Sequence, residues 1–383
     1  MRSRVPTAGL LLLIGVSCSL PTAAASVRPF FARRTSVDAS MVVWHISVVA
    51  KREAPGIVIT VEDARSNVLS RVSRLAPERV DLLESLGRVL AEDVVSDIDT
   101  ASSDDVCTGQ RAVLAGDTVL RSGAVLDAAS LGQLAAAGRD TALVFRRPDV
   151  AIVSTGDELV GVADFPGPGK VRNSNAYSLA ARVRAAGGVP RLLGIARDDL
   201  AEMRALLRLA RVFDLMVTTG GASLGDFDLI RDALGEVGEL ESGVLDPRRR
   251  APQTYGVIGE TLFFGLPGKP ASTMVGFELF VRPAIRKMQG FAALDRPTVR
   301  AVLASDIRKK SARHYYAPGV LSPIAAGGGG CEWEASVPRH RSFAMLAAAQ
   351  GAECLVSLPE GTAGLKAGAI VECLRLDKEE GAP

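Results

Sequence analysis

Residues 218–228 read Thr-Thr-Gly-Gly-Ala-Ser-Leu-Gly-Asp-Phe-Asp. An apolar run that begins at Leu215 precedes them, and a helical pattern that includes Ile230 and Leu234 follows. This order predicts a strand, a glycine turn and the start of a helix, a geometry in which free backbone N–H groups bind an anion. Because the carboxylates of Asp226 and Asp228 stand in the same turn, we expect a cation to accompany the anion. The stretch therefore predicts a site for a polyanion and a metal ion.

The turn belongs to a region, from Val150 to about Ile285, in which short apolar runs alternate with helical patterns. The apolar runs predict strands at residues 150–154, 192–195, 215–218 and 262–264. The helical patterns predict helices at residues 175–186, 199–209, 228–234 and 272–288. Strands and helices that alternate in this way are typical of an α/β fold. We therefore expect a doubly wound, mostly parallel sheet at the centre of the chain.

The flanking regions have different patterns. A capping-box-like start at Thr60 predicts one helix, an apolar stripe over residues 82–90 predicts a second, and residues 128–137 predict a third that ends at Gly138. After Gly290, short alternating segments separated by turn signals predict a small β-barrel or sandwich. The predicted divisions are a leader or unassigned region at 1–54, an N-terminal helical and irregular segment at 55–147, the α/β domain at 148–292 and a C-terminal β-barrel domain at 293–380.

Composition narrows the possible functions. The chain has 383 residues and a formal net charge of +2, so its length predicts several domains and its charge gives no reason to propose a nucleic-acid partner. Five cysteines without a Cys-x-x-Cys pair favour reduced thiols over a zinc site or a disulfide framework. The three histidines are well separated, which argues against a metal centre built from histidine.

The first residues resemble a targeting segment. Residues 1–37 contain no acidic side chain, and Arg2 and Arg4 precede an apolar run over residues 8–16. Three interpretations stay open: a secretory signal, an organellar transit peptide and a start assigned too far upstream. Because the unpaired cysteines favour a reducing compartment, we expect a cytoplasmic protein.

Three polar motifs follow predicted strands of the central region. They are Ser154-Thr-Gly-Asp-Glu158, Gly220-Gly-Ala-Ser-Leu-Gly-Asp226 and Gly265-Leu-Pro-Gly-Lys-Pro270. Open α/β sheets bind ligands beyond the carboxyl ends of their parallel strands. One glycine turn is weak evidence of a site, but three turns at one sheet edge predict a binding site there.

The residue types in these motifs suit a phosphorylated ligand and a magnesium ion. Glycines at 220, 221 and 225 permit backbone conformations in which N–H groups surround phosphate oxygens. Hard oxygen ligands for Mg²⁺ are offered by Asp157, Glu158, Asp226 and Asp228. For Asp226 and Asp228, helix capping is an equal alternative to metal binding. Ser174 and Asn175 could donate to a heterocycle or a phosphate, and capping is the alternative for them as well. No Ser–His pair and no reactive cysteine context supports covalent catalysis.

Five of these stretches together resemble one protein family. They are Thr155-Gly-Asp-Glu-Leu159, Asn173-Ser-Asn175, Asp198-Asp199, Gly220-Gly-Ala-Ser-Leu-Gly-Asp-Phe-Asp228 and Gly265-Leu-Pro-Gly-Lys-Pro270. In order and spacing they resemble the molybdopterin molybdenumtransferases of the MoeA type, which include the E domains of gephyrin and of the plant Cnx proteins. The resemblance covers roughly residues 57–377 and implies a MoaB/Mog-like central domain.

The resemblance implies a reaction and a set of roles. The reaction is the Mg²⁺-dependent transfer of molybdate onto adenylylated molybdopterin, with release of AMP, by a homodimer that has a molybdopterin adenylyltransferase as a partner protein. By resemblance, the pterin-nucleotide pocket is lined by Thr155, Gly156, Asp157 and Glu158. Phosphate and nucleotide groups would be held by Ser174, Asn175, Gly220, Gly221, Ser223 and Gly225. The pocket wall would include Pro267, Gly268 and Pro270. The metal ligands would be Asp226 and Asp228, and the catalytic acids would be Asp157, Asp226 and Asp228.

The sequence also departs from the family pattern. Members carry a Pro-Pro-Phe-Asp-Asn-Ser-Ala-Met-Asp-Gly-Tyr-Ala stretch and then a small inserted domain, whereas Ile98-Asp-Thr-Ala-Ser-Ser-Asp-Asp-Val106 stands here and the chain continues almost directly to Gly116. A Pro-Gly-Lys-Pro motif is replaced near Asp246, and the usual Gly-Asn-Pro is Gly268-Lys269-Pro270. Two hypotheses follow: an active molybdenumtransferase, and an impaired molybdopterin-binding or scaffold protein. A third, an adenylyltransferase-type relative, is disfavoured by the N-terminal helices and the C-terminal β domain.

Overall fold

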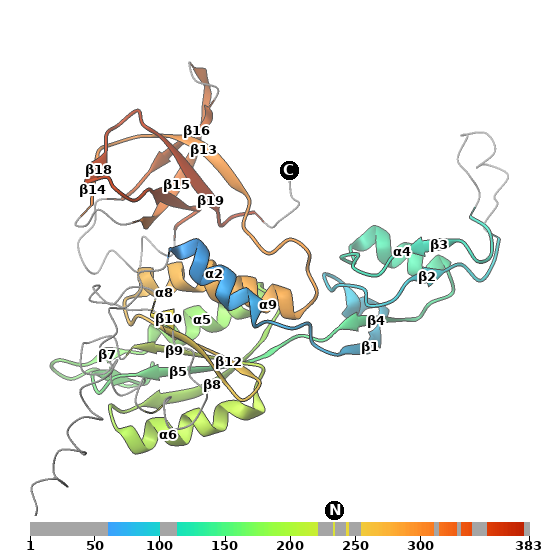
Figure 1. Cartoon of the computed structure of the whole chain (residues 1–383), viewed down its shortest axis with the longest axis horizontal. Coiled ribbons are helices and arrows are strands. Elements are labelled where there is room, and N and C mark those ends of the chain that lie inside the picture. Colours follow the sequence, from blue (N-terminus) through green and yellow to red (C-terminus); the bar gives the residue numbers. More distant parts are fainter. Residues whose placement is uncertain are drawn as a thin grey trace, which may run out of the picture. The chain divides into compact units, whose positions relative to one another are not determined.

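The computed structural model describes residues 60–99, 113–220, 233, 243–244, 254–309, 314–327, 331–338 and 351–378. A six-stranded sheet forms the centre of this structure, in the order β10-β11-β12-β9-β5-β8 (Figure 1). Its strands are β5 (Asp149–Thr155), β8 (Val189–Ala196), β9 (Leu215–Gly220), β10 (Gly243–Val244), β11 (Thr254–Ile258) and β12 (Thr261–Leu266). Strands β8, β5, β9 and β12 are mutually parallel, and β11 joins β12 as an antiparallel hairpin. The predicted α/β fold with a mostly parallel sheet is confirmed.

Helices cover both faces of this sheet (Figure 1). On one face lie α5 (Ser174–Ala185), α8 (Pro270–Gly276) and α9 (Arg282–Met288), and on the other lies α6 (Leu200–Leu209). Alternate residues of each strand point to opposite faces, so Val150 and Ile152 belong to one core cluster while Ala151 and Val153 belong to the other. Both clusters are fully buried, which explains why these strands read as continuous apolar runs.

The last helical region is one continuous rod with an irregular middle. Helix α8 is followed without a break by a π-helical segment, η3 (Phe277–Val281), and then by α9. The predicted single helix over 272–288 therefore starts two residues earlier and contains a π turn. Glu278 lies in this turn with its side chain buried, and its carboxylate accepts hydrogen bonds from Arg182 of α5 at 2.9 Å and from Arg296 at 3.1 Å. The ion pairs connect the rod to α5 and to the segment that leads into the C-terminal domain.

The N-terminal segment contains one predicted helix and lacks another. Helix α2 (Val61–Ser70) begins where the capping box predicts, with the Thr60 hydroxyl accepting from the Asp63 amide at 3.0 Å. The helix predicted over residues 82–90 is wrong: only a short 3-10 turn, η1 (Leu82–Ser85), forms there. Gly87 then adopts a φ of 74°, and Val89 and Leu90 make extended bridges to Val125 and Val144. Pairing with distant strands outweighs the local helical spacing.

The rest of this segment is a small mixed unit. It contains β1 (Pro77–Asp81), β2 (Val94–Val95), β3 (Thr118–Leu120), α4 (Ala128–Ala136) and β4 (Thr141–Phe145). Helix α4 ends as predicted, because Gly138 adopts a φ of 72° just beyond it. Its core cluster, which includes Leu90, Leu126 and Leu134, is separate from the two clusters of the central sheet.

The C-terminal region is a closed five-stranded barrel in the order β13-β16-β15-β17-β19. Its strands are β13 (Thr298–Leu303), β15 (Tyr315–Gly327), β16 (Cys331–Ser336), β17 (Cys354–Leu358) and β19 (Ile370–Arg375), with β14 (Ile307–Arg308) paired to β18 (Gly364–Leu365) beside them. Between the two predicted alternatives, barrel and sandwich, the structure shows the barrel. Cys354 and Cys373 are buried in its core as free thiols. No helix in the described part of the chain is long and apolar enough to cross a membrane.

Candidate functional site

Three adjacent strands of the central sheet end side by side. In the parallel register, Thr155 at the end of β5 lies opposite Gly220 at the end of β9, and Leu266 at the end of β12 lies opposite Thr219. The segments that leave these strands are the three polar motifs of the sequence. Parallel pairing therefore brings the start of each motif to the same edge of the sheet, where open α/β sheets bind ligands.

The backbones of the three motifs are in close contact at this edge. Gly220 has a φ of 110°, and a Cβ atom there would lie well under 3.0 Å from the carbonyl oxygen of Thr155. A Cβ atom on Gly268 would lie 3.2 Å from the Cα of Gly220. Any side chain at Gly220 would push the strand ends apart, so glycine is required by both conformation and space.

Asn175 connects these motifs through its side-chain amide. Its Nδ2 donates to the Thr219 hydroxyl at 3.0 Å and to the Gly268 carbonyl at 2.7 Å. It also lies 3.4 Å from the hydroxyl of Thr273 on α8. The carbonyl of Pro267 in turn accepts hydrogen bonds from the hydroxyls of Thr219 and Thr273. The amide that the resemblance assigns to ligand binding is thus used to hold α5, β9 and the 267–270 turn together.

The helix cap at the start of α5 is made by Asn173. Its Oδ1 accepts from the Ala176 amide at 3.3 Å and from the Ser154 hydroxyl at 2.8 Å, so it joins the first motif to the helix. Ser174 is the first residue of the helix and is exposed. Capping was one of the two roles considered for Ser174 and Asn175, but the residue that caps the helix is their neighbour Asn173. Pro270 stands at the first position of α8, where the missing N–H of proline costs nothing.

Asp157 and Asp198 are linked to each other beyond the ends of β5 and β8, because the carboxylate of each lies near the backbone amide of the other. The Asp157 amide lies 3.4 Å from Oδ2 of Asp198, and the Asp198 amide lies 3.5 Å from Oδ1 of Asp157. Lys170 donates to the Asp157 carbonyl at 2.6 Å from the loop between β6 (Leu159–Val160) and β7 (Val171–Arg172). Glu158 is exposed, and its carboxylate occupies the space beside Gly156 that a Cβ would fill. The Asp157 side chain is exposed and that of Asp198 is half-buried, and carboxylates of this kind are suitable ligands for a hard cation.

Two buried hydroxyls near this edge, those of Thr155 and Thr218, have no hydrogen-bond partner among the described residues. Thr155 is 1% exposed, and its Oγ1 has no hydrogen-bond partner among the residues that the structure describes. This oxygen lies 3.0 Å from the point where a Cβ on Gly220 would stand. A buried polar group without a partner is costly, and such groups are typical of sites that a ligand completes.

Part of the predicted site cannot be placed. Gly221, Ser223, Gly225, Asp226 and Asp228 all lie outside the described residues. Within the described ranges, no group of three or more His, Cys, Asp or Glu side chains is arranged to hold a metal ion. The metal ligands expected at positions 226 and 228 therefore stay a prediction.

Sequence reasoning did not assign a role to several residues that the fold brings to this edge. Asp198 follows the strand predicted at residues 192–195, so its position beyond a strand's carboxyl end was the signal that could have indicated it. Thr219 and Thr273 act through hydrogen bonds to Asn175, which no spacing pattern indicates. Lys170 reaches the Asp157 carbonyl from 13 residues away, and the sequence carries no signal for that contact.

Two family profiles match the chain. The profile described as "Probable molybdopterin binding domain" matches residues 151–287, the part that forms the central sheet. The profile described as "MoeA C-terminal region (domain IV)" matches residues 300–376, the part that forms the barrel. The chain belongs to the MoeA family. The two domain matches occur in the same order as the sheet and the barrel in the fold.

Relatives within the MoeA family show how much of the protein is shared. A molybdopterin molybdenumtransferase of Staphylococcus aureus is 31% identical over 270 residues, which are 69% of this chain and 62% of the relative. Molybdopterin molybdenumtransferase 2 of Mycobacterium tuberculosis is 33% identical over 265 residues, which are 67% of this chain and 63% of the relative. The chain thus matches less than two thirds of the length of either relative.

Solved structures agree with the MoeA fold. A molybdopterin biosynthesis MoeA protein from Pyrococcus horikosii superimposes with a TM-score of 0.68 at 23% identity, covering 83% of this chain and 99% of that one. A molybdenum cofactor biosynthesis protein from Pyrococcus furiosus superimposes with a TM-score of 0.59 at 26% identity, covering 82% and 98%. The fold is shared across the N-terminal segment, the sheet and the barrel.

Proposed function

We propose that this MoeA family protein acts in molybdenum cofactor biosynthesis, where it inserts molybdate into adenylylated molybdopterin and releases AMP. The observation that carries the proposal is the contact between Thr155, Gly220 and Gly268, which brings three glycine-containing motifs together at the carboxyl edge of a parallel sheet. Such an edge is the usual ligand site of this class of fold. The names of the relatives support the same activity.

The proposed substrate carries a pyrophosphate, and the edge offers donors for it. The buried hydroxyl of Thr155 is available to a phosphate oxygen, and it lies beside Gly220, where β9 ends. The ammonium group of Lys170 stands at the rim beside Asp157. Fixed donors of this kind stabilise negative charge that develops as the link to AMP breaks.

A magnesium ion would neutralise phosphate charge during this transfer, and the chain has suitable side chains for it. Asp157 and Asp198 lie beside each other beyond the ends of β5 and β8, where the carboxylate of each accepts from the backbone amide of the other. The family resemblance adds Asp226 and Asp228 from the turn after Gly220. Asp157 and Asp198 would hold the ion at the edge of the sheet where Thr155 and Lys170 meet the phosphate groups.

Release of AMP tests this proposal. We expect the purified protein to release AMP from adenylylated molybdopterin only when both molybdate and Mg²⁺ are present. Asp228→Ala is expected to abolish release, whereas Asp199→Asn is expected to retain it, because Asp199 serves as the N-cap of α6 and asparagine caps equally well. Absence of release by the wild-type chain under these conditions would refute the enzyme proposal.

A second candidate is a molybdopterin-binding or scaffold protein without turnover. It is favoured by the sequence at residues 98–106, which lacks the acidic stretch of the family, and by the match to only 62% of the Staphylococcus aureus relative. Tight binding of adenylylated molybdopterin with no release of AMP would select this alternative.

Our proposal for this MoeA family protein also includes a homodimer, a molybdopterin adenylyltransferase as partner and a cytoplasmic location. Light scattering would test the homodimer, co-purification the partner, and cell fractionation the location.

A further inference from the structure

A loop between β6 and β7 stands at the carboxyl edge of the sheet that carries the three motifs, here called the motif edge. It comprises residues 161–170, the β6–β7 loop, and the parallel pairing of the two strands holds its ends side by side. Its last residue, Lys170, donates to the carbonyl of Asp157 at 2.6 Å, just beyond the end of β5. In Figure 1 the loop projects from the end of the sheet toward which β5 points. The loop therefore begins and ends beside the candidate functional site.

Two hydrogen-bonded turns fix the conformation of the β6–β7 loop. In the first turn, the Asp164 amide donates to the Gly161 carbonyl at 3.2 Å, and the Asp164 carboxylate accepts from the Gly161 amide at 3.1 Å. In the second turn, the Lys170 amide donates to the Gly167 carbonyl at 3.0 Å. Arg172 of β7 donates from Nε to the Asp164 carbonyl at 3.1 Å, which ties the first turn to the returning strand. The two residues between the turns are therefore held in a defined position.

The residue that follows the first turn is Phe165, and its side chain is 89% exposed. Within the described part of the chain, no other large apolar side chain is more exposed. Single exposed apolar side chains are common on protein surfaces, so exposure alone assigns no role to Phe165. Its position on a fixed loop at the motif edge points to a role, because a ligand that covers the ring removes apolar surface from water.

The same loop carries a cation at its base. The ammonium group of Lys170 has three N–H donors, and the Asp157 carbonyl takes one of them, so the group has further donors for an anion. Flat heterocycles stack on aromatic side chains, and phosphate oxygens accept hydrogen bonds from ammonium groups. The β6–β7 loop therefore matches a ligand that has both a flat ring and a phosphate group better than it matches a simple anion.

We propose that Phe165 stacks on a flat heteroaromatic ring of the substrate while Lys170 binds its phosphate oxygens. This inference rests on the proposed function, whose substrate has an adenine ring and a pterin ring joined through a pyrophosphate. Both rings have the flat face that stacks on a phenyl group. Phe165 is then a substrate-binding residue that favours ring-bearing phosphates over simple anions.

Isothermal titration of the full chain tests the proposal with AMP, free pterin and inorganic pyrophosphate as probes. We expect Phe165→Ala to weaken binding of a ring-bearing probe by about tenfold, because the stacking contact is lost, and to leave the affinity for pyrophosphate unchanged. Weakening for AMP alone identifies adenine as the stacked ring, and weakening for pterin alone identifies the pterin. Phe165→Trp keeps a flat ring and is expected to bind at least as tightly as the wild type, a result that misfolding cannot produce.

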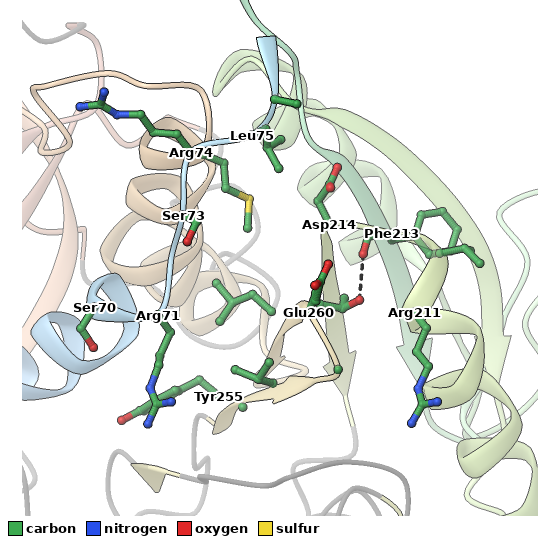
Figure 2. A pocket seen from close by; sticks show the side chains of 18 of the residues that line it. Ser70, Arg71, Ser73, Arg74, Leu75, Arg211, Phe213, Asp214, Tyr255 and Glu260 are labelled. Carbon is green, nitrogen blue, oxygen red and sulfur yellow. Dashed lines mark hydrogen bonds between the residues drawn. The ribbon is translucent and has the colours of Figure 1, made fainter.

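A matched control comes from a cavity at the opposite edge of the sheet (Figure 2). Its lining includes Asp214, directly before β9, and Glu260, directly before β12, so it lies at the amino ends of these strands. Val212 in the same lining is 73% exposed, and Val212→Ala is expected to leave the affinities for all three probes unchanged. Because the Phe165 side chain is 89% exposed, the unfolding midpoint of Phe165→Ala is expected to equal that of the wild type.

The inference is overturned if neither AMP nor pterin binds at millimolar concentration, if Phe165→Ala binds both as tightly as the wild type, or if it loses pyrophosphate binding to the same extent. Failure of the proposed function is a separate result, because these affinities are measured without turnover. Release of AMP with the same KM for adenylylated molybdopterin in the wild type and in Phe165→Ala would keep the proposed function and exclude the stacking role. Binding that depends on Phe165 in a chain that releases no AMP would keep the stacking role and exclude the enzyme.

Discussion

The carbonyl oxygen of Thr155 occupies the position that a side chain on Gly220 would need. These two residues end the neighbouring strands β5 and β9 and are paired in the parallel register. A Cβ on Gly220 would lie well under 3.0 Å from that oxygen, and Gly220 itself has a φ of 110°. The strand ends are therefore packed backbone against backbone at the candidate site.

Gly220→Ala is expected to destabilise the fold and open the motif edge. Gly194 of β8 is a matched control, because its φ is 103° but a Cβ there meets nothing within 4 Å. Gly194→Ala should lose about 1–3 kcal/mol of unfolding free energy from backbone strain alone. Gly220→Ala should lose more, because the Thr155 carbonyl must also move. Urea denaturation of both variants measures the difference, and equal losses would show that the close approach is unimportant.

Asn175→Ala is expected to destabilise the ligand-free protein by about 1–3 kcal/mol, because the buried Thr219 hydroxyl and the Gly268 carbonyl lose their donor. Asn175→Asp should be worse, since a carboxylate oxygen would face the Gly268 carbonyl, which now lies 2.7 Å from Nδ2. Ser178→Ala on the exposed face of α5 is the control and should have little effect. Unfolding is measured without ligand. A stable Asn175→Ala protein that binds ligand poorly would restore the ligand-binding role and contradict the structural one.

Asp157→Asn and Asp198→Asn are each expected to weaken Mg²⁺ binding by about tenfold, or about 1.4 kcal/mol. Each change removes one of two adjacent carboxylates while keeping the size of the side chain. Asp199→Asn is the neighbouring control, because its oxygen still caps α6. Isothermal titration with Mg²⁺ gives the affinities. Unchanged affinity in both variants would place the metal elsewhere in the site.

Glu278→Gln is expected to cost about 3 kcal/mol of unfolding free energy, because the buried carboxylate that neutralises Arg182 and Arg296 would be lost. The surface pair of Glu92 with Arg79 offers a comparison, with side chains 39% and 53% exposed. Glu92→Gln should change stability by less than about 1 kcal/mol. Chemical denaturation distinguishes the two cases, and similar losses would mean that burial of Glu278 adds nothing.

The barrel is expected to lose stability at alkaline pH through Tyr316. Burial, followed by the nearby Glu62 carboxylate, raises the pKa of the Tyr316 phenol from 10.0 to about 12. The folded state therefore holds the proton more tightly, so this contribution is complete below about pH 10 and is lost as the pH rises to about 12.

Tyr316→Phe tests this dependence, because phenylalanine cannot ionise. Denaturation midpoints between pH 9 and pH 12 should fall less steeply in this variant than in the wild type, and Tyr315→Phe, which changes a 45% exposed residue, should behave as the wild type. An identical slope for Tyr316→Phe and the wild type would exclude Tyr316 as the source.

Local patterns predicted much of the fold. Strands β5, β9 and β12 were recognisable because both faces of a parallel sheet are buried, which makes each strand a continuous apolar run. Helix α2 was recognisable by the hydroxyl of Thr60, because a cap is a contact within one turn of chain. The helix predicted from the apolar spacing of residues 82–90 was wrong, because Val89 and Leu90 form isolated bridges to Val125 and Val144, far along the chain.

By itself, the sequence determined the α/β and barrel architecture, the edge at which the three motifs end, and the carboxylates and glycines available there. Those properties depend on residue type and short-range spacing. Only the tertiary structure decided that the Asn175 amide holds the motifs together and that the backbone amide of Asp198 meets the carboxylate of Asp157. Each of these depends on which strands become neighbours, and that is set by packing across the whole sheet rather than by any single stretch.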